Sequence, residues 1–183
     1  MQPLRSTHFQ LRPFRVSDEA QLVMAVRESM STVGLWMPWA RADYSVFDAQ
    51  EWFARCAAAM EEGTAYDIGV FSPDGRDLYG SVAINQIRRE DNLGNLGYWI
   101  RESRQHRGLA SGAAAMMACH GFHALGLTRL EIVAVETNHA SRAVAEKIGA
   151  EFECIARNRL ILRGRPVAAA VYSLVPESFS VPS

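Results

Sequence analysis

The sequence has few cysteines, and they are scattered. Cys56, Cys119 and Cys154 are the three among 183 residues, far apart and within apolar helix or strand patterns. An odd, dispersed set argues against a disulfide framework or a zinc site and predicts buried thiols. His120 and His123 lie three residues apart on an expected helix, but no third ligand follows at a suitable spacing. We therefore expect no metal.

The chain also lacks an excess of charge and a long apolar run. Nineteen Lys and Arg residues against twenty Asp and Glu residues give a formal net charge of -1. No overall field is available to hold a nucleic-acid backbone, so we expect no direct nucleic-acid partner. No segment is long and apolar enough to span a bilayer, and residues 1–7 lack the apolar core of a signal peptide. These absences predict a cytoplasmic protein that makes no membrane contact.

No repeat, low-complexity tract or linker divides the chain. With 49% apolar and 21% charged residues, 183 residues are enough for one good core and too few for two. We expect a single domain over residues 1–183, with its core over about 9–175 and a loosely held tail after it. The sequence leaves both a monomer and a homodimer open.

Periodicity predicts an α+β fold with a mixed sheet. Alternating or continuous apolar runs predict strands over residues 9–14, 66–71, 78–86, 96–100, 129–135, 152–162 and 167–175. Capping residues followed by helical spacing predict about four helices, over residues 17–26, 45–62, 109–125 and 140–148. The helix from residue 109 can serve as the crossover that joins two parallel strands.

Residues 104–112, with the sequence RQHRGLASG, lie between a predicted strand and a helix of small residues. Gly108 and Gly112 would let an anion approach the backbone, where the free N–H groups of the first helical turn carry about half a positive charge. Arg104, His106 and Arg107 add cationic or protonatable groups. The pattern predicts a diphosphate site and hence an anionic cofactor. An ordinary strand-to-helix turn is the alternative.

Two motifs together resemble the acetyl-CoA signature of the GNAT superfamily of N-acetyltransferases. The first is Gln105-x-x-Gly108-x-Ala110, and the second is Asn138-x-x-Ser141-x-x-x-x-Glu146-Lys147-x-Gly149-Ala150. The chain is similar to the RimJ/RimL type of ribosomal-protein N-terminal acetyltransferase over residues 9–175. The segments that carry this resemblance are Leu11-Arg12-Pro13, Trp36-Met37-Pro38-Trp39, Gly97-Tyr98-Trp99-Ile100 and Tyr172-Ser173-Leu174.

The resemblance implies an α/β/α layered fold with a mostly antiparallel sheet of about seven strands, splayed between the fourth and fifth. It implies that acetyl-CoA, the acyl donor, inserts its pantetheine arm there and pairs with the backbone of Trp99 and Ile100. Asn138 would hydrogen-bond the arm from the other side. The residues that it implies for the diphosphate are Gln105, His106, Arg107, Gly108, Leu109, Ala110, Ser111 and Gly112.

For the chemistry, the resemblance points to Ser141. Many relatives place a tyrosine four residues later to protonate the leaving thiolate, but Ala145 stands there, so the Ser141 hydroxyl is the available donor. The alternative is that Ser141 caps its helix or holds the cofactor. Relatives often have carboxylates at the places of Asn95 and Ala168, so no strong general base is visible there. Three carboxylates that could act through water are Glu90, Asp91 and Glu102.

The missing base bears on the acceptor amine. With pKa values of about 10.4 for Lys and about 7.7 to 8.0 for an α-amino group, deprotonation near neutral pH costs Lys roughly 4 kcal/mol and the α-amine under about 1 kcal/mol. We therefore expect a protein or peptide α-amine that attacks the thioester directly. A small amine as acceptor, and a non-catalytic acyl-CoA-binding module, are the alternatives. The residues expected at the acceptor site are Trp36, Trp39, Asn95 and Tyr172, with core packing as the alternative for the tryptophan loop.

Overall fold

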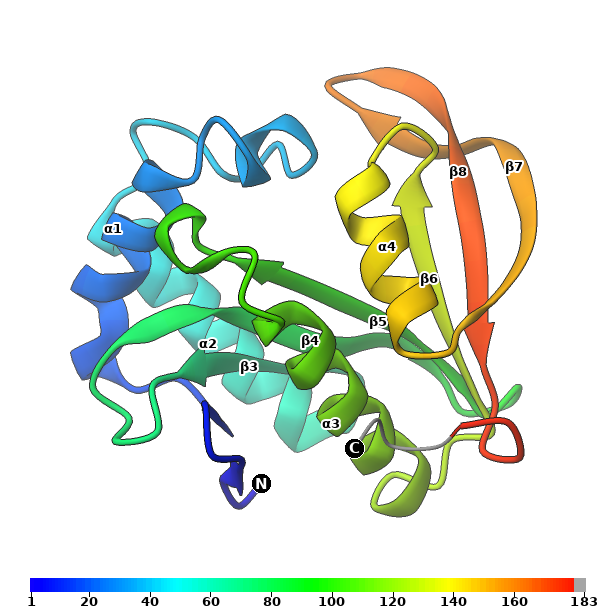
Figure 1. Cartoon of the computed structure of the whole chain (residues 1–183). Coiled ribbons are helices and arrows are strands. Elements are labelled where there is room, and N and C mark those ends of the chain that lie inside the picture. The colour runs from blue at the N-terminus through cyan, green and yellow to red at the C-terminus, as the bar shows by residue number, and fades with distance from the viewer. Residues whose placement is uncertain (180–183) are drawn as a thin grey trace.

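Eight strands form one open sheet in the computed structural model, which describes residues 1–179 (Figure 1). Their order is β1-β2-β3-β4-β5-β6-β8-β7. The strands are β1 Leu4–Arg5, β2 Gln10–Arg12, β3 Tyr66–Phe71, β4 Leu78–Arg88, β5 Leu93–Ile100, β6 Arg129–Val135, β7 Glu151–Leu162 and β8 Arg165–Leu174. All neighbours are antiparallel except β5 and β6, which confirms the mixed, mostly antiparallel sheet. The expected count was one too low, because the two-residue β1 was missed.

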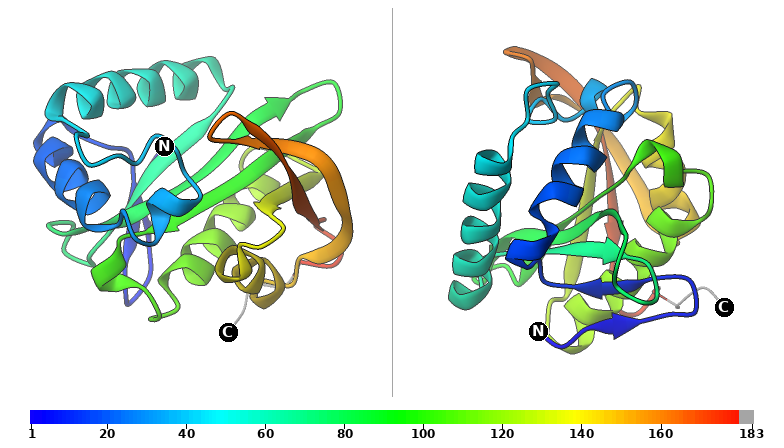
Figure 2. Two further views of the ribbon diagram at one scale, coloured as in Figure 1. Left: turned by 90° about the horizontal axis from the view of Figure 1, so that it is seen from above. Right: turned by 90° about the vertical axis from the view of Figure 1, so that its left-hand side faces the viewer.

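Four α-helices in the described part of the chain cover the two faces of the sheet, as expected. They are α1 Glu19–Glu28, α2 Val46–Glu62, α3 Leu109–His123 and α4 His139–Lys147. Helices α1 and α2 lie on one face, and α3 and α4 lie on the other (Figure 2). Short 3-10 turns occur at Val16–Asp18, Val33–Leu35 and Glu102–Arg104. Over residues 1–179, no helix combines the length and the apolar character that crossing a bilayer would need.

Small residues let α3 lie close against the sheet. A Cβ added to Gly121 would come within 2.6 Å of the Ile84 Cδ1 atom, and one added to Gly112 within 2.9 Å of the Phe9 Cε1 atom. The lack of a side chain at Gly112 therefore allows close packing against Phe9. Because α3 is buried along most of its length, its first turn is held in a fixed position.

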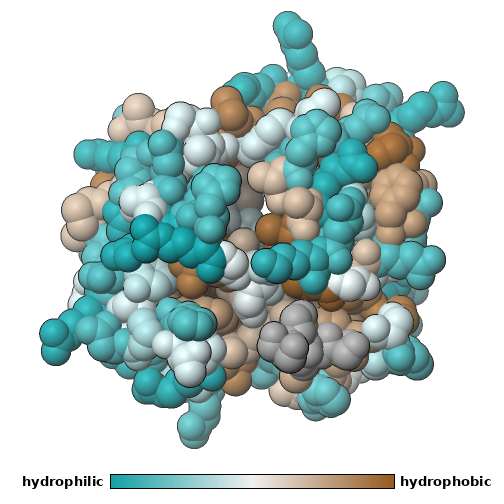
Figure 3. All heavy atoms as spheres, in the orientation of Figure 1, coloured by the Kyte–Doolittle hydropathy of each residue, from teal (hydrophilic) through white to brown (hydrophobic). Residues whose placement is uncertain are grey.

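Strands β5 and β6 pair only at their beginnings in the described part of the chain. Their register joins Leu93–Asn95 to Arg129–Glu131 and ends there. β5 stays paired with β4 as far as Ile100, and β6 stays paired with β8 as far as Val135. The sheet therefore opens into a wedge between the fourth and fifth of the seven predicted strands, as expected. The surface is hollowed between α4 and the turn that leads into α3 (Figure 3).

The three cysteines are free thiols, but not all are buried. Cys56 is buried, Cys119 is half-buried and Cys154 is exposed. Burial raises the pKa of the Cys56 thiol to about 12. The prediction of buried thiols is wrong for Cys154, because β7 is an edge strand with most of its side chains in solvent. Among residues 1–179, no three His, Cys, Asp or Glu side chains are grouped so as to hold a metal ion.

A buried ion pair joins β2 to the start of α1. The Arg12 guanidinium donates hydrogen bonds of 2.7 and 2.9 Å to the Asp18 carboxylate, and the two side chains are 6% and 4% exposed. Asp18 also accepts a hydrogen bond from the Arg15 N–H at 2.8 Å. Arg12 lies over the Phe71 ring, 3.5 Å from its centroid. Because both charges are desolvated, removal of either side chain would leave the other charge buried without a partner.

We expect Asp18→Ala to lower the free energy of unfolding by about 3–5 kcal/mol, because Arg12 would remain buried without its partner. Asp91→Ala is the control: its ion pair with Arg88 joins side chains that are 50% and 55% exposed, and the expected loss is under about 1 kcal/mol. Urea denaturation measures both. Similar losses in the two variants would contradict the importance of the buried pair.

Candidate active site

Two hydroxyl groups meet between β5 and α4. The Tyr98 hydroxyl donates to the Ser141 carbonyl oxygen at 2.8 Å, and the Ser141 hydroxyl donates to the Tyr98 oxygen at 3.4 Å. Burial raises the pKa of Tyr98 to about 12, so its proton stays in place at neutral pH. Ser141 therefore lies beside the wedge. Tyr98, which sequence reasoning noted only as part of a short motif, joins it there.

Asn138 caps α4 and stands at the end of β6. Its Oδ1 atom accepts a hydrogen bond of 3.1 Å from the Ser141 N–H, and its own N–H donates to the Val135 carbonyl at 2.8 Å. The residue that caps α4 is thus Asn138, and the alternative of Ser141 as the cap is wrong. Within residues 1–179, the side-chain NH2 group of Asn138 makes no hydrogen bond.

The segment before α3 presents unpaired backbone donors. Gly108 is the N-cap in a left-handed conformation (φ 74°), and no side chain caps the helix. The Gly112 N–H donates to the Gly108 carbonyl at 2.9 Å, but the N–H groups of residues 106–111 have no acceptor in the described chain. A Cβ at Gly108 would meet nothing within 4 Å. Free donors at the positive end of a helix dipole can bind an anion. We call residues 106–111 the cradle.

Two side chains of this region are already engaged. The Gln105 Nε2 group donates to the Thr32 hydroxyl at 3.1 Å and to the Ile100 carbonyl at 2.8 Å. The Ser111 hydroxyl donates to the Gly108 carbonyl at 3.0 Å. Gln105 therefore ties the segment to the loop after α1, and the groups left for an anion at the cradle belong mainly to the backbone.

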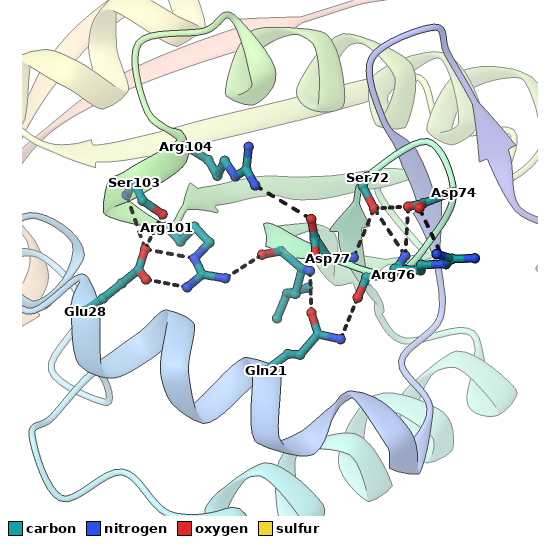
Figure 4. A network of polar contacts seen from close by, with 10 residues as sticks. Gln21, Glu28, Ser72, Asp74, Arg76, Asp77, Arg101, Ser103 and Arg104 are labelled. Carbon is teal, nitrogen blue, oxygen red and sulfur yellow. Dashed lines mark hydrogen bonds and ion pairs between the residues drawn. The ribbon is translucent and has the colours of Figure 1, made fainter.

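A polar network fastens the turn before the cradle to α1 and to the β3–β4 loop (Figure 4). Glu28 accepts hydrogen bonds from the Arg101 Nε group at 2.8 Å and from the Ser103 hydroxyl at 2.7 Å. These hydrogen bonds lower the pKa of Glu28 to about 2, and the bond from Arg101 has the largest effect. Arg104, expected beside the anion, pairs with Asp77 at 3.7 Å. The turn is thus held by charges that persist across the physiological pH range.

The backbone of β5 faces the wedge at alternate residues. The Trp99 carbonyl oxygen would lie 2.1 Å from a Cβ added to Gly80, so this carbonyl points to β4. Because neighbouring residues of a strand point their backbone groups in opposite directions, Tyr98 and Ile100 face the wedge. The expectation that the Trp99 backbone lies open there is wrong. The Ile100 carbonyl does point into the wedge, where it accepts the hydrogen bond from Gln105.

A cavity of about 390 Å³ opens on the face of the sheet that α1 and α2 cover. Tyr98 and Trp99 belong to its wall, so the cavity adjoins the wedge. Trp39 packs edge-on against Trp99, with 5.7 Å between ring centroids, and is 41% exposed. An aromatic-walled cavity beside the wedge is the candidate acceptor site.

The four residues expected at the acceptor site do not all lie in the cavity wall. Trp39 lines the cavity, whereas Trp36, in the same loop, is not part of its wall. The Asn95 side chain donates to the Asn85 Oδ1 atom at 3.0 Å, and Asn85 is the one of the two that lines the cavity. Asn95 thus reaches the site indirectly.

For Tyr172, the fourth of these residues, the prediction is wrong. Its side chain is fully buried, with the ring packed edge-on against Phe152 at 5.4 Å. Its hydroxyl donates to the Glu146 carboxylate at 2.8 Å and accepts from the Arg142 Nε group at 3.1 Å. Tyr172 is a core residue that joins β8 to α4.

Asp67 is a carboxylate in the cavity wall that sequence reasoning missed. It lies half-buried on β3, and burial raises its pKa to about 6, against the effect of a hydrogen bond from Asn85. Asp48, also in the wall, has its pKa lowered to about 2 by hydrogen bonds from Ser45 and Arg41. The available signal was one acidic residue within the otherwise apolar strand YDIGVF.

Comparison with known proteins agrees with this geometry. A family model described as "Acetyltransferase (GNAT) domain" matches residues 8–151. A protein of Bacillus subtilis named "Putative ribosomal N-acetyltransferase YdaF" is 26% identical over 175 residues, which cover 92% of this chain and 91% of that protein.

Solved structures share the whole fold. A structure from Vibrio cholerae, described as a "putative ribosomal-protein-serine acetyltransferase", has a TM-score of 0.84 and 33% identity, and the match covers 95% of this chain and 97% of that one. RimJ of Mycobacterium smegmatis, in complex with CoA-disulfide, has a TM-score of 0.87 and 24% identity, with 96% and 87% covered. The chain belongs to the GNAT family of N-acetyltransferases, and its structural neighbours include enzymes of the RimJ/RimL type.

Proposed function

We propose that this acetyltransferase transfers the acetyl group of acetyl-CoA to the α-amino group of a protein or peptide. The observation that carries the proposal is the wedge between β5 and β6, which has the cradle after the end of β5 and the aromatic cavity beside it. The names of YdaF and of the Vibrio cholerae neighbour point to ribosomal proteins as acceptors of those proteins. A ribosomal protein is therefore the first acceptor to test.

The fit to acetyl-CoA follows from the unpaired groups. The diphosphate would lie at the amides of the cradle, where no side chain competes for the first turn of α3. The pantetheine arm would run along β5 as an added strand, facing the backbone of Tyr98 and Ile100. The free NH2 group of Asn138 would reach the arm from the β6 side. Bound CoA in the RimJ neighbour supports this choice of donor.

The transfer needs a proton donor for the thiolate that leaves. The amine attacks the thioester carbonyl carbon, a C–N bond forms, and the C–S bond breaks. We assign the donor role to the Ser141 hydroxyl, which lies 3.4 Å from the Tyr98 hydroxyl. Tyr98 fixes α4 to β5 through the Ser141 carbonyl, and so holds Ser141 in place.

The acceptor class follows from amine chemistry. At pH 7 roughly a tenth of an α-amine with a pKa near 7.9 is neutral, compared with about 0.04% of a lysine with a pKa of 10.4. A site that binds both amines equally therefore favours the α-amine by more than about 100-fold. The aromatic wall offered by Trp39 and Trp99 suits the first residues of a peptide.

Gly108→Ala is expected to weaken CoA binding by about tenfold or more, because a left-handed conformation costs alanine about 1–2 kcal/mol and the cradle amides would shift. Gly112→Ala is the matched variant, since its new Cβ would press on Phe9 at 2.9 Å. We expect it mainly to lower the melting temperature. Titration calorimetry and thermal unfolding separate the two effects. Equal losses of CoA affinity would contradict the assignment of the cradle to Gly108.

Ser141→Ala is expected to lower kcat by about 100-fold or more, with CoA affinity nearly unchanged, because the thiolate would lose its proton donor. Tyr98→Phe is the comparison, since it removes the hydroxyl partner of Ser141 and leaves the Ser141 hydroxyl itself. Release of free thiol from acetyl-CoA measures turnover. A larger loss of kcat in Tyr98→Phe than in Ser141→Ala would move the donor role to Tyr98.

The acceptor is tested with a peptide that has a free N-terminus and no lysine, set against an N-blocked peptide of the same length with one lysine. At pH 7 we expect kcat/KM to favour the free N-terminus by at least about 100-fold, for the reason given by the neutral fractions. Mass spectrometry locates the acetyl group. Preference for the lysine, or for a polyamine or amino acid in a parallel panel, would contradict the proposal.

A further inference from the structure

We propose that Asp67 is the group that takes the proton from the acceptor amine before it attacks the thioester. The inference rests on the acetyl transfer proposed above and names a base for it. Asp67 lies on β3, and its side chain shares the wall of the acceptor cavity with Tyr98 and Trp99. Tyr98 contacts Ser141 directly. The proposed proton donor therefore adjoins, through Tyr98, the cavity that Asp67 lines.

A row of neutral amides holds this carboxylate. Strand register places Asp67 opposite Ala83 on β4, and Asn85 opposite Asn95 on β5. The Asn95 side chain donates to the Asn85 Oδ1 atom at 3.0 Å, which leaves the Asn85 NH2 group to hydrogen-bond Asp67. Within residues 1–179, no cation contributes to the pKa of Asp67. A carboxylate that is oriented but not neutralised is free to accept a proton from an ammonium group.

Other titratable groups surround Asp67 without competing for this role. In the acceptor cavity these are Arg41, Tyr44, Asp48, Arg55 and Tyr98. Burial raises the pKa of both tyrosines to about 12, so they stay neutral. Asp48 is bound by Ser45 and Arg41, which lower its pKa to about 2 and make it a weak base.

A second cavity, of about 380 Å³, also has Asp67 in its wall. Its titratable groups are the amino terminus at Met1, together with Cys56 and Glu61 of α2. Burial, aided by the charge of Asp67, raises the pKa of Cys56 to about 12, so the thiol stays protonated. Asp67, with its pKa raised to about 6 by burial, changes charge just below neutral pH, which suits a general base.

The protons balance in this scheme. The incoming ammonium gives one proton to the Asp67 carboxylate, and its lone pair then forms the C–N bond at the thioester carbonyl carbon. As the C–S bond breaks, the sulfur keeps the electron pair and takes the Ser141 hydroxyl proton. Ser141 recovers the second proton from the amine nitrogen, and Asp67 passes its proton to water. The products are an amide, a thiol and one released proton.

This base also discriminates between amines. The pKa of an α-amine is about two units above the pKa of Asp67, whereas the pKa of a lysine is more than four units above it. Proton transfer to Asp67 is therefore unfavourable by about 100-fold for the α-amine and by about 10,000-fold or more for lysine. The absence of a carboxylate at Asn95 does not leave the site without a base, because Asp67 supplies one two strands away.

The test is Asp67→Asn, which keeps the shape of the side chain and its contact with Asn85. With an N-terminal peptide at pH 7, we expect kcat/KM to fall by about tenfold, because only about a tenth of the α-amine is neutral at this pH without a base. Wild-type kcat/KM should fall as pH drops through about 6, where Asp67 is protonated. Asp67→Asn should lack this step and should instead gain activity up to the pKa of the amine, near 8. A pH-independent loss, or an unchanged profile, would overturn the inference.

Two controls separate the loss of a base from damage to the fold. Glu151→Gln changes an exposed carboxylate at the start of β7 and is expected to keep the wild-type profile. At pH 8, Asp67→Asn should have a higher melting temperature than wild type. At pH 5, the difference in melting temperature between the two proteins should be smaller. Burial raises the pKa of Asp67 in the folded protein above its ordinary value of 3.8, so the native carboxylate destabilises the fold increasingly as pH rises from about 4 to 6.

Failure of this inference can be distinguished from failure of the proposed function. If wild type acetylates an amine of another class and not an N-terminal peptide, the acceptor proposed above is wrong. The same comparison of pH profiles, made with that amine, still tests Asp67. If wild type acetylates N-terminal peptides and Asp67→Asn does so equally well at pH 6, the function stands and Asp67 is not the base.

Discussion

The loss of pairing between β5 and β6 is the constraint on which the rest of the site depends. After Asn95 and Glu131 the two strands diverge, and backbone groups that would complete a sheet are left facing a gap. Such edges suit an extended ligand that adds itself as a strand. The contact between Tyr98 and Ser141 spans this gap. It joins the two halves of the sheet and places the Ser141 hydroxyl where the proposed chemistry needs it.

The cradle depends on rigid support from both sides. Small residues allow α3 to pack closely on the sheet, and the bonds of Glu28 to Arg101 and Ser103 hold the preceding turn to α1. Arg104 forms an ion pair with Asp77, so the proposed anion site consists mainly of backbone amides. Fixed amides bind an anion without the entropy cost of ordering long side chains. At Asp67, the proposed chemistry and the stability of the fold make opposite demands. Burial raises the pKa of its carboxyl to about 6, which suits a base, but the buried charge lowers the free energy of unfolding.

Much of the fold could be predicted because its signals are local. The strand Tyr66–Phe71, the helix that begins at Leu109 and the turn at Gly108 follow from periodicity and capping, which involve residues close in sequence. The strand β1 has only two residues, too few for a periodic signal. The exposure of Cys154 could not be predicted, because it depends on β7 lying at the edge of the sheet.

The sequence by itself determined the elements, their order and the motif segments on either side of the wedge. Only the tertiary structure decided which side chains meet: Tyr98 with Ser141 across 43 positions, Asp67 in one wall with Trp39, and Tyr172 in the core. It also decided that the Trp99 backbone faces β4. The reason is strand register. A shift of one residue exchanges the faces of a strand, and register is set by pairing between distant segments, which local patterns do not specify.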